Sequence, residues 1–241
     1  QKSYQVVLGH EYKFQAWNRP FILTTELYYK YLKDIIPYEV DNIRIRYYAD
    51  QKATGYATGL DIKINGEFVK GIESWASMSI MKTAENIQYF IDANGGILSQ
   101  TQVNNGAEYV RDTIISGIPR PSDQRINFAI FFQDYLPLIP SFKVNLKLIF
   151  GTGLPFGPSE SERYQQKNRM TPYRRVDLGF SKQLIGDATS FRNPRNPLNY
   201  IRNCWLSLEV FNLLGVNNVS SYMWVTDIYN IQYAVPNYLT S

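Results

Sequence analysis

Apolar and polar residues alternate along residues 124–151, and shorter versions of the same pattern recur through the chain. In 126–133 and again in 143–151, every second residue is Ile, Phe, Val or Leu, and most of the residues between them are polar or small. Successive side chains of a β-strand point to opposite faces, so this period of two predicts a hairpin with one apolar face and one polar face. Pro137 and Pro140 interrupt the ladder between the two runs and predict their connection.

The same alternation predicts six further strands, so we expect an all-β chain. Residues 83–123 have no sustained period of either kind. We expect a long loop there, and loops of that length are normally functional or disordered. The six further strands are expected at 4–15, 21–31, 56–65, 75–80, 175–181 and 205–210.

The pattern leaves open what the apolar face contacts. It can pack on a second sheet in a soluble sandwich, or it can face lipid in a barrel whose polar face lines a wet interior. Membrane strands need roughly 9 to 11 tilted residues and are bracketed by aromatic belts, and both strands of the 124–151 hairpin fit that description. The connections near 16, 68 and 138 are short, whereas 34–54, 83–123 and 152–172 are long. This alternation of short and long connections is typical of an outer-membrane barrel, although the connection at residues 187–200 is longer than the pattern predicts.

Composition narrows the class of protein further. No apolar run is long enough for a membrane helix. The mean hydropathy of -0.30 resembles that of a soluble protein, but it does not discriminate, because lipid-facing and lumen-facing residues average out along barrel strands. The 19 Tyr and 13 Phe favour interfacial belts and ligand-facing loops. The net charge of +4 is spread over strands and loops, which argues against nucleic-acid binding.

Catalytic and metal chemistry find little support in the sequence. The single His, His10, lies on an apolar strand face, where packing is the simpler role. The single Cys, Cys204, excludes a disulfide within the chain and a thiolate metal cluster. No Gly-rich phosphate loop and no Ser/His/Asp set can be assembled. We therefore expect no enzyme activity, no cofactor and no metal site.

Charged residues fall into two groups that we expect to differ in role. Those on the polar strand faces would face the lumen and form interior ion pairs, or else contact a plug or a passing ligand. Cationic and aromatic residues of the long connections suit an anionic or sugar-like ligand, although contact with lipopolysaccharide phosphates or solvent is an equal alternative. The predicted lumen-facing residues are Asp61, Lys63, Arg125, Lys143, Lys147, Arg175, Asp177 and Glu209, and the predicted ligand-binding residues are Arg44, Arg46, Tyr47, Tyr48, Arg163, Tyr164, Lys167 and Arg169.

Six short motifs, spread over nearly the whole chain, carry a family resemblance. They are Leu23-Thr-Thr-Glu-Leu-Tyr-Tyr-Lys-Tyr-Leu32, Ile36-Pro-Tyr38, Gly55-Tyr-Ala-Thr-Gly-Leu-Asp61, Gly151-Thr-Gly-Leu-Pro-Phe156, Tyr173-Arg-Arg-Val-Asp-Leu-Gly179 and Leu208-Glu-Val-Phe-Asn-Leu-Leu214. In this order and spacing they resemble the C-terminal barrel region of TonB-dependent outer-membrane receptors of the Bacteroidota type. The last motif is similar to the Asn-Leu-Phe motif of the family's penultimate strand, with Leu214 in place of Phe.

The resemblance implies that residues 1–241 are the later part of an antiparallel transmembrane β-barrel of 22 strands, with about eight strands present here. It implies a bacterial outer-membrane location, contact with lipid, import of a scarce nutrient, and a TonB complex and a surface lipoprotein as partners. The family's N-terminal plug and TonB-contact segment have no match, and 213–241 is expected to be the last outer loop. We therefore expect the plug and further strands elsewhere in the same polypeptide. The alternatives are a barrel subunit with a structural or assembly role and a soluble sugar-binding β-sandwich.

Overall fold

The computed structural model describes residues 1–136, 139–158, 161–186 and 197–239, and within them the protein is all-β. The strand pairings are antiparallel, which confirms the predicted strand class. The helical elements are short: α1 (Gln100–Asn104) and the 3₁₀ turns η1 (Arg163–Gln165) and η2 (Pro197–Tyr200). Among the described residues, no helix has the length and apolar character needed to cross a membrane.

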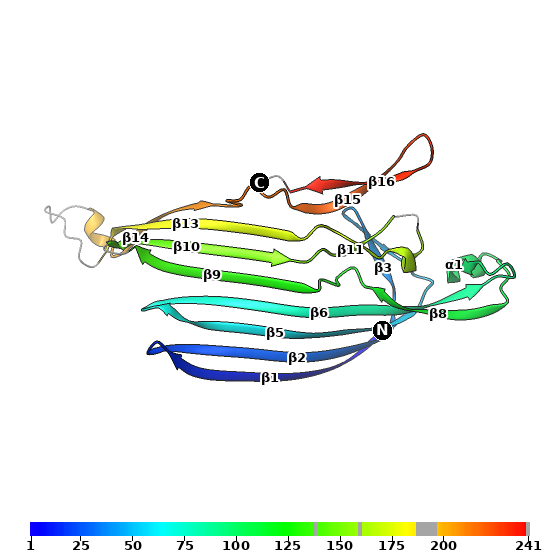
Figure 1. Cartoon of the computed structure of the whole chain (residues 1–241), viewed down its shortest axis with the longest axis horizontal. Helices are drawn as coiled ribbons and strands as arrows, with labels where there is room; N and C mark the ends of the chain where they lie inside the picture. Colours follow the sequence, from blue (N-terminus) through cyan, green and yellow to red (C-terminus); the bar gives the residue numbers. More distant parts are fainter. Residues whose placement is uncertain (137–138, 159–160, 187–196, 240–241) are drawn as a thin grey trace.

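Eight strands lie side by side in one sheet, which we call the wall, and each of them pairs with the next wall strand along the chain (Figure 1). Each of the eight stretches with alternating residues lies within one of these strands. The two edge strands, β1 and β14, do not pair with each other in the described part of the chain. From edge to edge the strands are β1 (Lys2–Ala16), β2 (Arg19–Ile35), β5 (Ala53–Val69), β6 (Ile72–Ile91), β9 (Ile126–Leu136), β10 (Ile139–Gly151), β13 (Tyr173–Ile185) and β14 (Cys204–Val210).

The connections between wall strands are short at one end, the turn end, except for the longer connection from β13 to β14, and they are long at the other end, the loop end (Figure 1). Trp17 and Asn18 join β1 to β2, and both have the positive φ values (51° and 56°) of a tight hairpin turn. The predicted connections at 137–138 and 187–196 lie outside the described residues. The loop end carries β3 (Tyr38–Asp41), β4 (Arg44–Tyr47), β7 (Ile97–Leu98), α1, β8 (Arg111–Pro119), β11 (Pro155–Phe156), η1, β12 (Asn168–Arg169), β15 (Val219–Thr226) and β16 (Gln232–Tyr238).

The prediction of a long irregular loop at 83–123 is wrong. β6 continues past its pairing with β9 and pairs with β8 and β7 instead. The alternation does not reveal this extension for two reasons. A buried charge, Glu85, stands among apolar residues, and the register shifts between Glu85 and Ile87, which interrupts the period of two. The expected outer loop at 213–241 likewise contains a hairpin, formed by β15 and β16.

The register of the wall keeps apolar residues on one face and polar residues on the other. Directly opposed residues of paired strands share a face, and successive residues of one strand alternate between faces. One apolar row crosses seven strands, and the row beside it is mainly polar. The apolar row is Tyr12, Leu23, Ile64, Ala76, Ile130, Leu148 and Val176, and the neighbouring row is Glu11, Thr24, Lys63, Ser77, Ala129, Ile149 and Arg175.

Aromatic side chains gather at both ends of the apolar face. At the turn end, the ring of Phe21 lies 5.6 Å from that of Phe14 and 5.8 Å from that of Trp17, measured between centroids. At the loop end, the rings of Tyr29 and Tyr56 lie 6.5 Å apart. The apolar face is thus bounded on both sides by rings that have an apolar body and, in Trp and Tyr, a polar group.

The apolar face of the wall is largely exposed. Leu8, Leu27 and Ile80, which lie in one row, have 69%, 54% and 45% of their surface accessible. The buried apolar cluster lies beyond the wall, at the loop end, and contains Leu32, Ile35, Ala53, Ile87, Tyr89 and Ile118.

Candidate functional site

The polar face of the wall brings together most of the residues that the sequence predicts to face a lumen. Lys63 of β5 lies in the same cross-strand row as Arg175 of β13. Two residues further along β13, Asp177 lies opposite Lys147 of β10. The guanidinium of Arg175 forms an ion pair with the carboxylate of Asp177 at 2.6 Å. These residues therefore pair across and along strands, as expected for a charged interior face. Asp61, Lys143 and Glu209 occupy the same face by register, whereas Arg125 lies before β9, outside the paired register, and its side chain pairs with Asp123 at the loop end.

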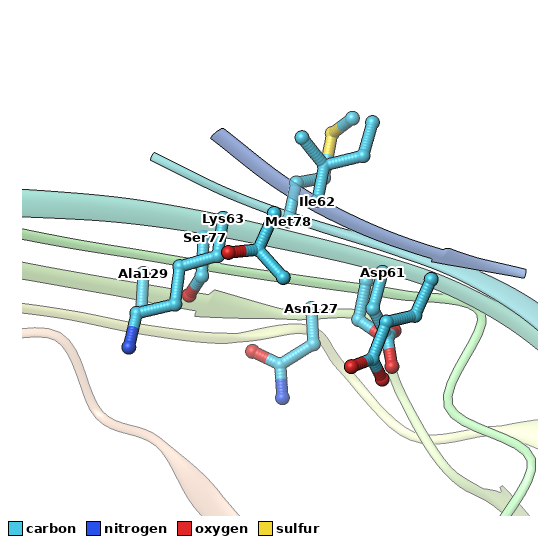
Figure 2. A pocket seen from close by; sticks show the side chains of 10 residues that line it. Asp61, Ile62, Lys63, Ser77, Met78, Asn127 and Ala129 are labelled. Atoms are coloured by element: carbon cyan, nitrogen blue, oxygen red, sulfur yellow. The ribbon is translucent and has the colours of Figure 1, made fainter. Parts of the chain in front are cut away.

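A hollow of about 450 Å³ lies on this polar face between β2, β5, β6 and β9. Figure 2 shows Asp61, Lys63 and Asn127 projecting to one side of the sheet, with Ile62 and Met78 on the other side. Within the hollow the hydroxyl of Ser79 donates to the carboxylate of Asp61. The hollow therefore offers charged and amide groups to whatever lies against the polar face of the wall.

Arginine residues fix the long β10–β13 connection to the rest of the loop end. The guanidinium of Arg163, which is 1% exposed, lies 3.0 Å from the carboxylate of Glu85 on β6, and it also donates to the carbonyl oxygen of Pro119. Arg120 lies 3.5 Å from the other oxygen of the same carboxylate. Beside this set, the ring of Tyr164 packs on Tyr89 at 5.2 Å. Glu85 is fully buried, so the two cations supply the pairing that a buried carboxylate needs.

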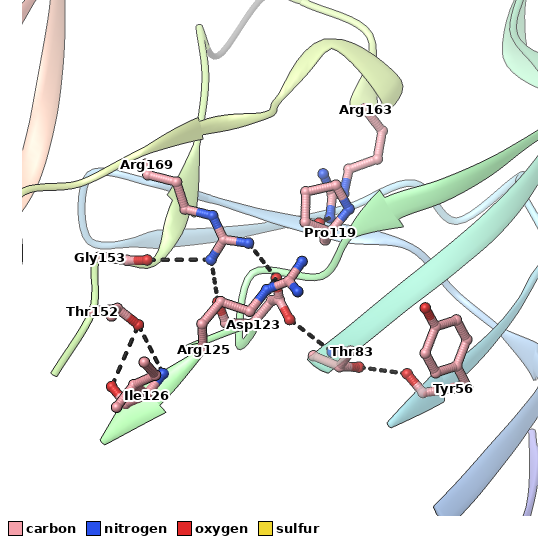
Figure 3. Close-up of polar contacts among 10 residues, drawn as sticks. All are labelled: Tyr56, Thr83, Pro119, Asp123, Arg125, Ile126, Thr152, Gly153, Arg163 and Arg169. Carbon is pink, nitrogen blue, oxygen red and sulfur yellow. Dashed lines mark hydrogen bonds and ion pairs between the residues drawn. The ribbon is translucent and has the colours of Figure 1, made fainter. Parts of the chain in front are cut away.

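Asp123 forms a second junction of the same kind (Figure 3). Its carboxylate, which is fully buried, accepts hydrogen bonds from Arg169 of β12, from Arg125 at 2.8 Å and from the backbone N–H of Thr83 at 2.7 Å. The hydroxyl of Thr83 donates in turn to the carbonyl oxygen of Tyr56. We call the residues around Glu85 and Asp123 the loop-end cluster: Thr83, Glu85, Arg120, Asp123, Arg163 and Arg169.

Glu39 anchors the β3–β4 hairpin. Its buried carboxylate accepts a 2.7 Å hydrogen bond from the hydroxyl of Tyr48 and another from the side-chain amide of Gln166, and Arg46 lies 3.5 Å away. Burial raises the pKa of Glu39, because the charged form loses water, and these partners only partly oppose that effect. Burial and the neighbouring carboxylate also raise the pKa of Tyr48.

The structure divides the predicted ligand-binding residues into two sets. Arg163 is covered, so a ligand cannot reach it in this arrangement, and Tyr48 and Arg169 bind acidic groups of the chain itself. Sequence reasoning missed their partners Glu39, Glu85 and Asp123, because nothing in the local pattern around an isolated carboxylate indicates burial. Arg46 and Tyr164 also contact residues of the loop end, whereas Arg44, Tyr47 and Lys167 are exposed.

Two asparagines attach the segment after β14 to the edge of β13. The side chain of Asn218 bonds to both the N–H and the C=O of Arg174, each at 2.9 Å, as a neighbouring strand would. Asn212 has a positive φ of 53°, and its side chain bonds to both backbone groups of Val216 at 3.1 Å. Its own N–H donates to Asp177 at 3.0 Å. Asn212, which belongs to the motif Leu208–Leu214, thus stabilises the turn that follows the last strand of the wall.

Comparison with known proteins identifies no relative: no protein-family model, no curated protein and no solved structure matches this chain. Among the described residues, no group of three or more His, Cys, Asp or Glu side chains has the arrangement of a metal site. The wall, its two faces and the loop end are therefore the observations from which a function can be argued.

Proposed function

We propose that this chain forms the later part of a 22-stranded outer-membrane β-barrel that imports a scarce nutrient as a TonB-dependent receptor. In this proposal the apolar face of the wall contacts lipid, and the polar face lines a lumen occupied by a plug from the same polypeptide. A TonB complex in the inner membrane supplies the energy, and the loop end faces outward and captures the ligand.

The exposed apolar face is the observation that carries the proposal. A soluble sheet buries its apolar face, whereas here Leu8, Leu27 and Ile80 are 45–69% exposed, no residue of the seven-strand apolar row is fully buried, and the buried cluster lies elsewhere. From Phe21 to Tyr31, β2 rises about 33 Å at about 3.3 Å per residue. With a tilt of about 40°, that length corresponds to an apolar band about 25 Å tall, the height usual for such barrels. The aromatic rings at both ends suit the two membrane interfaces.

The unpaired edges support a longer polypeptide around this sheet. The backbone groups on the outer edges of β1 and β14 have no strand partner among the described residues. Unpaired backbone groups in hydrocarbon are costly, so a membrane wall must continue on both sides. Further strands of the same polypeptide fill that requirement in the proposal.

Uptake tests the import role. A strain lacking the gene is compared with its parent for growth and accumulation on a panel of scarce nutrients, with and without a protonophore that collapses the proton gradient. We expect the deletion to abolish energy-dependent uptake of one nutrient class. Equal uptake by both strains across the panel would count against import.

A second candidate function, holding a partner protein at the outer surface, is favoured by the exposed face of the β15–β16 hairpin. Met223 opposes Val235, and Val225 opposes Tyr233, and all four are 41–52% exposed. Exposed apolar patches of this kind occur at protein interfaces. Val225→Asp, on the exposed face of this hairpin, distinguishes the roles: a holding function should lose its partner on purification in mild detergent, whereas an import function should keep its uptake.

A further inference from the structure

A shallow hollow of about 480 Å³ lies on the apolar face of the wall, where β6 and β9 separate. The ladder between these two strands ends at Ile80 and Ile126, and beyond this point β6 pairs with β8 instead. The lining of the hollow is mainly apolar. It includes Leu27 and Ile80, which are 54% and 45% exposed, so the described part of the chain leaves this apolar surface open.

Two cationic residues, Lys82 and Arg125, line the same hollow. Lys82 is exposed, and it forms no hydrogen bond or ion pair with another residue that the structure describes. Arg125 donates to the carboxylate of Asp123, which also accepts from Arg169, so two cations share one anion (Figure 3). These groups together leave an excess of positive charge beside an apolar surface.

The register places Lys82 level with the aromatic rings at the loop end of the apolar face. Tyr29 opposes Thr58, and Thr58 opposes Lys82, so the three residues share one cross-strand row on that face. The ring of Tyr29 stacks on that of Tyr56. In the proposed barrel, such rings mark the height at which lipid headgroups meet the hydrocarbon. The cations of the hollow therefore lie at headgroup height, and Ile80 lies on the hydrocarbon side of them.

We propose that this hollow binds one membrane lipid with an anionic phosphate headgroup. The phosphate accepts charge-assisted hydrogen bonds from Lys82 and Arg125, and an acyl chain lies against Leu27 and Ile80. A free phosphate gains only the cations, and a neutral lipid gains only the apolar surface, so charge and apolar area together select an anionic lipid. The proposal rests on the lipid contact of the proposed barrel and is independent of import.

The test measures lipid binding to the full-length protein, purified in a neutral detergent, by native mass spectrometry. The probes are dioleoyl phosphatidylglycerol, dioleoyl phosphatidylcholine, which has the same chains and a zwitterionic headgroup, and glycerophosphoglycerol, which is the anionic headgroup without chains. We expect phosphatidylglycerol to bind more tightly than phosphatidylcholine, and the chain-free headgroup not to bind at the same concentration. Lys82→Gln should weaken phosphatidylglycerol binding by about fivefold, the effect of one cation facing an anionic lipid, and Lys82→Arg should retain it.

Lys70→Gln is the matched control. It removes an exposed Lys from the β5–β6 turn, at the other end of the wall, and should bind the lipid as the parent does. Equal affinity for the two lipids, equally tight binding of the chain-free headgroup, or equal affinity of Lys82→Gln and the parent would each overturn the proposal. Recovery of the parent protein in the outer-membrane fraction reports on the barrel separately. A protein that inserts but shows no lipid preference contradicts this proposal alone, whereas a protein that does not insert contradicts the proposed function as well.

Discussion

The wall and the loop end bury their residues in opposite ways. In the wall, Leu8 on the apolar face is 69% exposed, whereas at the loop end the carboxylate of Glu85 and the side chain of Ile87 are fully buried. The wall is held by backbone ladders between neighbouring strands, and the loop end by a small apolar cluster and ion pairs that join segments far apart in sequence. In the proposed barrel this difference reflects two solvents: lipid beside the wall, which accepts apolar side chains, and water around the loop end, which must form its own core.

The largest effect on the protein as a whole, loss of membrane insertion, is expected from a charge placed in the middle of the apolar face. Leu146→Arg should prevent stable insertion, because a lipid-facing Arg near the bilayer midplane costs about 2–4 kcal/mol in a barrel. The measurement is the fraction of protein recovered in the outer membrane and its heat-dependent mobility in detergent gels. Gln133→Arg is the matched control, since Gln133 lies beside Leu146 in the same hairpin but on the polar face. If both variants insert equally well, the apolar face does not contact lipid.

A large local effect is expected from Arg163→Ala. It leaves the buried carboxylate of Glu85 with Arg120 as its remaining cation, and breaking a buried ion pair costs about 3–5 kcal/mol. Limited proteolysis should then cut the β10–β13 connection while the wall stays intact. Lys167→Ala, in the same connection but exposed, should leave the cleavage pattern unchanged. Equal resistance of both variants would mean that the Arg163 pair does not hold the connection.

A smaller effect is expected where the chain leaves the wall. Asn212→Ala loses both bonds to Val216 and places an alanine at a positive φ, at a cost of about 1–3 kcal/mol. Thermal unfolding in detergent should show a lower midpoint. Asn212→Gly loses the same bonds but adopts the backbone angle without strain, so its midpoint should lie between those of Asn212→Ala and the parent. A midpoint for the glycine variant below that of the alanine variant would contradict this account of the turn.

The smallest effect is a pH dependence of the β3–β4 hairpin. Burial raises the folded-state pKa of Glu39, and of Glu162 nearby, above the unfolded value. Between the unfolded and the folded pKa, the folded state therefore binds more protons than the unfolded state. Protonation of these carboxyl groups stabilises the fold fully below the unfolded pKa, and this stabilisation is lost as the pH rises through the folded pKa. Hydrogen exchange of residues 38–48, corrected for intrinsic rates, should show better protection at pH 5 than at pH 7.5. Glu39→Gln should reduce that difference, and an unchanged difference would assign it to other groups.

The strands of the wall follow from the sequence because their pattern is local. The period of two between Tyr12 and Phe14, or between Leu146 and Leu148, depends only on successive side chains pointing to opposite faces, and the register confirms an antiparallel, all-β chain. Whether the wall closes, and into how many strands, stays a prediction. The extension of β6 could not be predicted in this way, because a β-bulge and the buried Glu85 interrupt the alternation of apolar and polar residues where β6 continues beyond the wall.

By itself, the sequence determined the eight alternating segments of the wall and which of their residues share a face, since both follow from neighbours along the chain. Only the tertiary structure decided that Arg163 and Arg169, which looked like free cations of an outer loop, are partners of Glu85 and Asp123. It likewise brought Lys82 and Arg125 to one hollow with Leu27, which lies far from both in the sequence. The physical reason is range: alternation is a property of adjacent residues, whereas the burial and pairing of a charge depend on segments that meet only when the chain has folded.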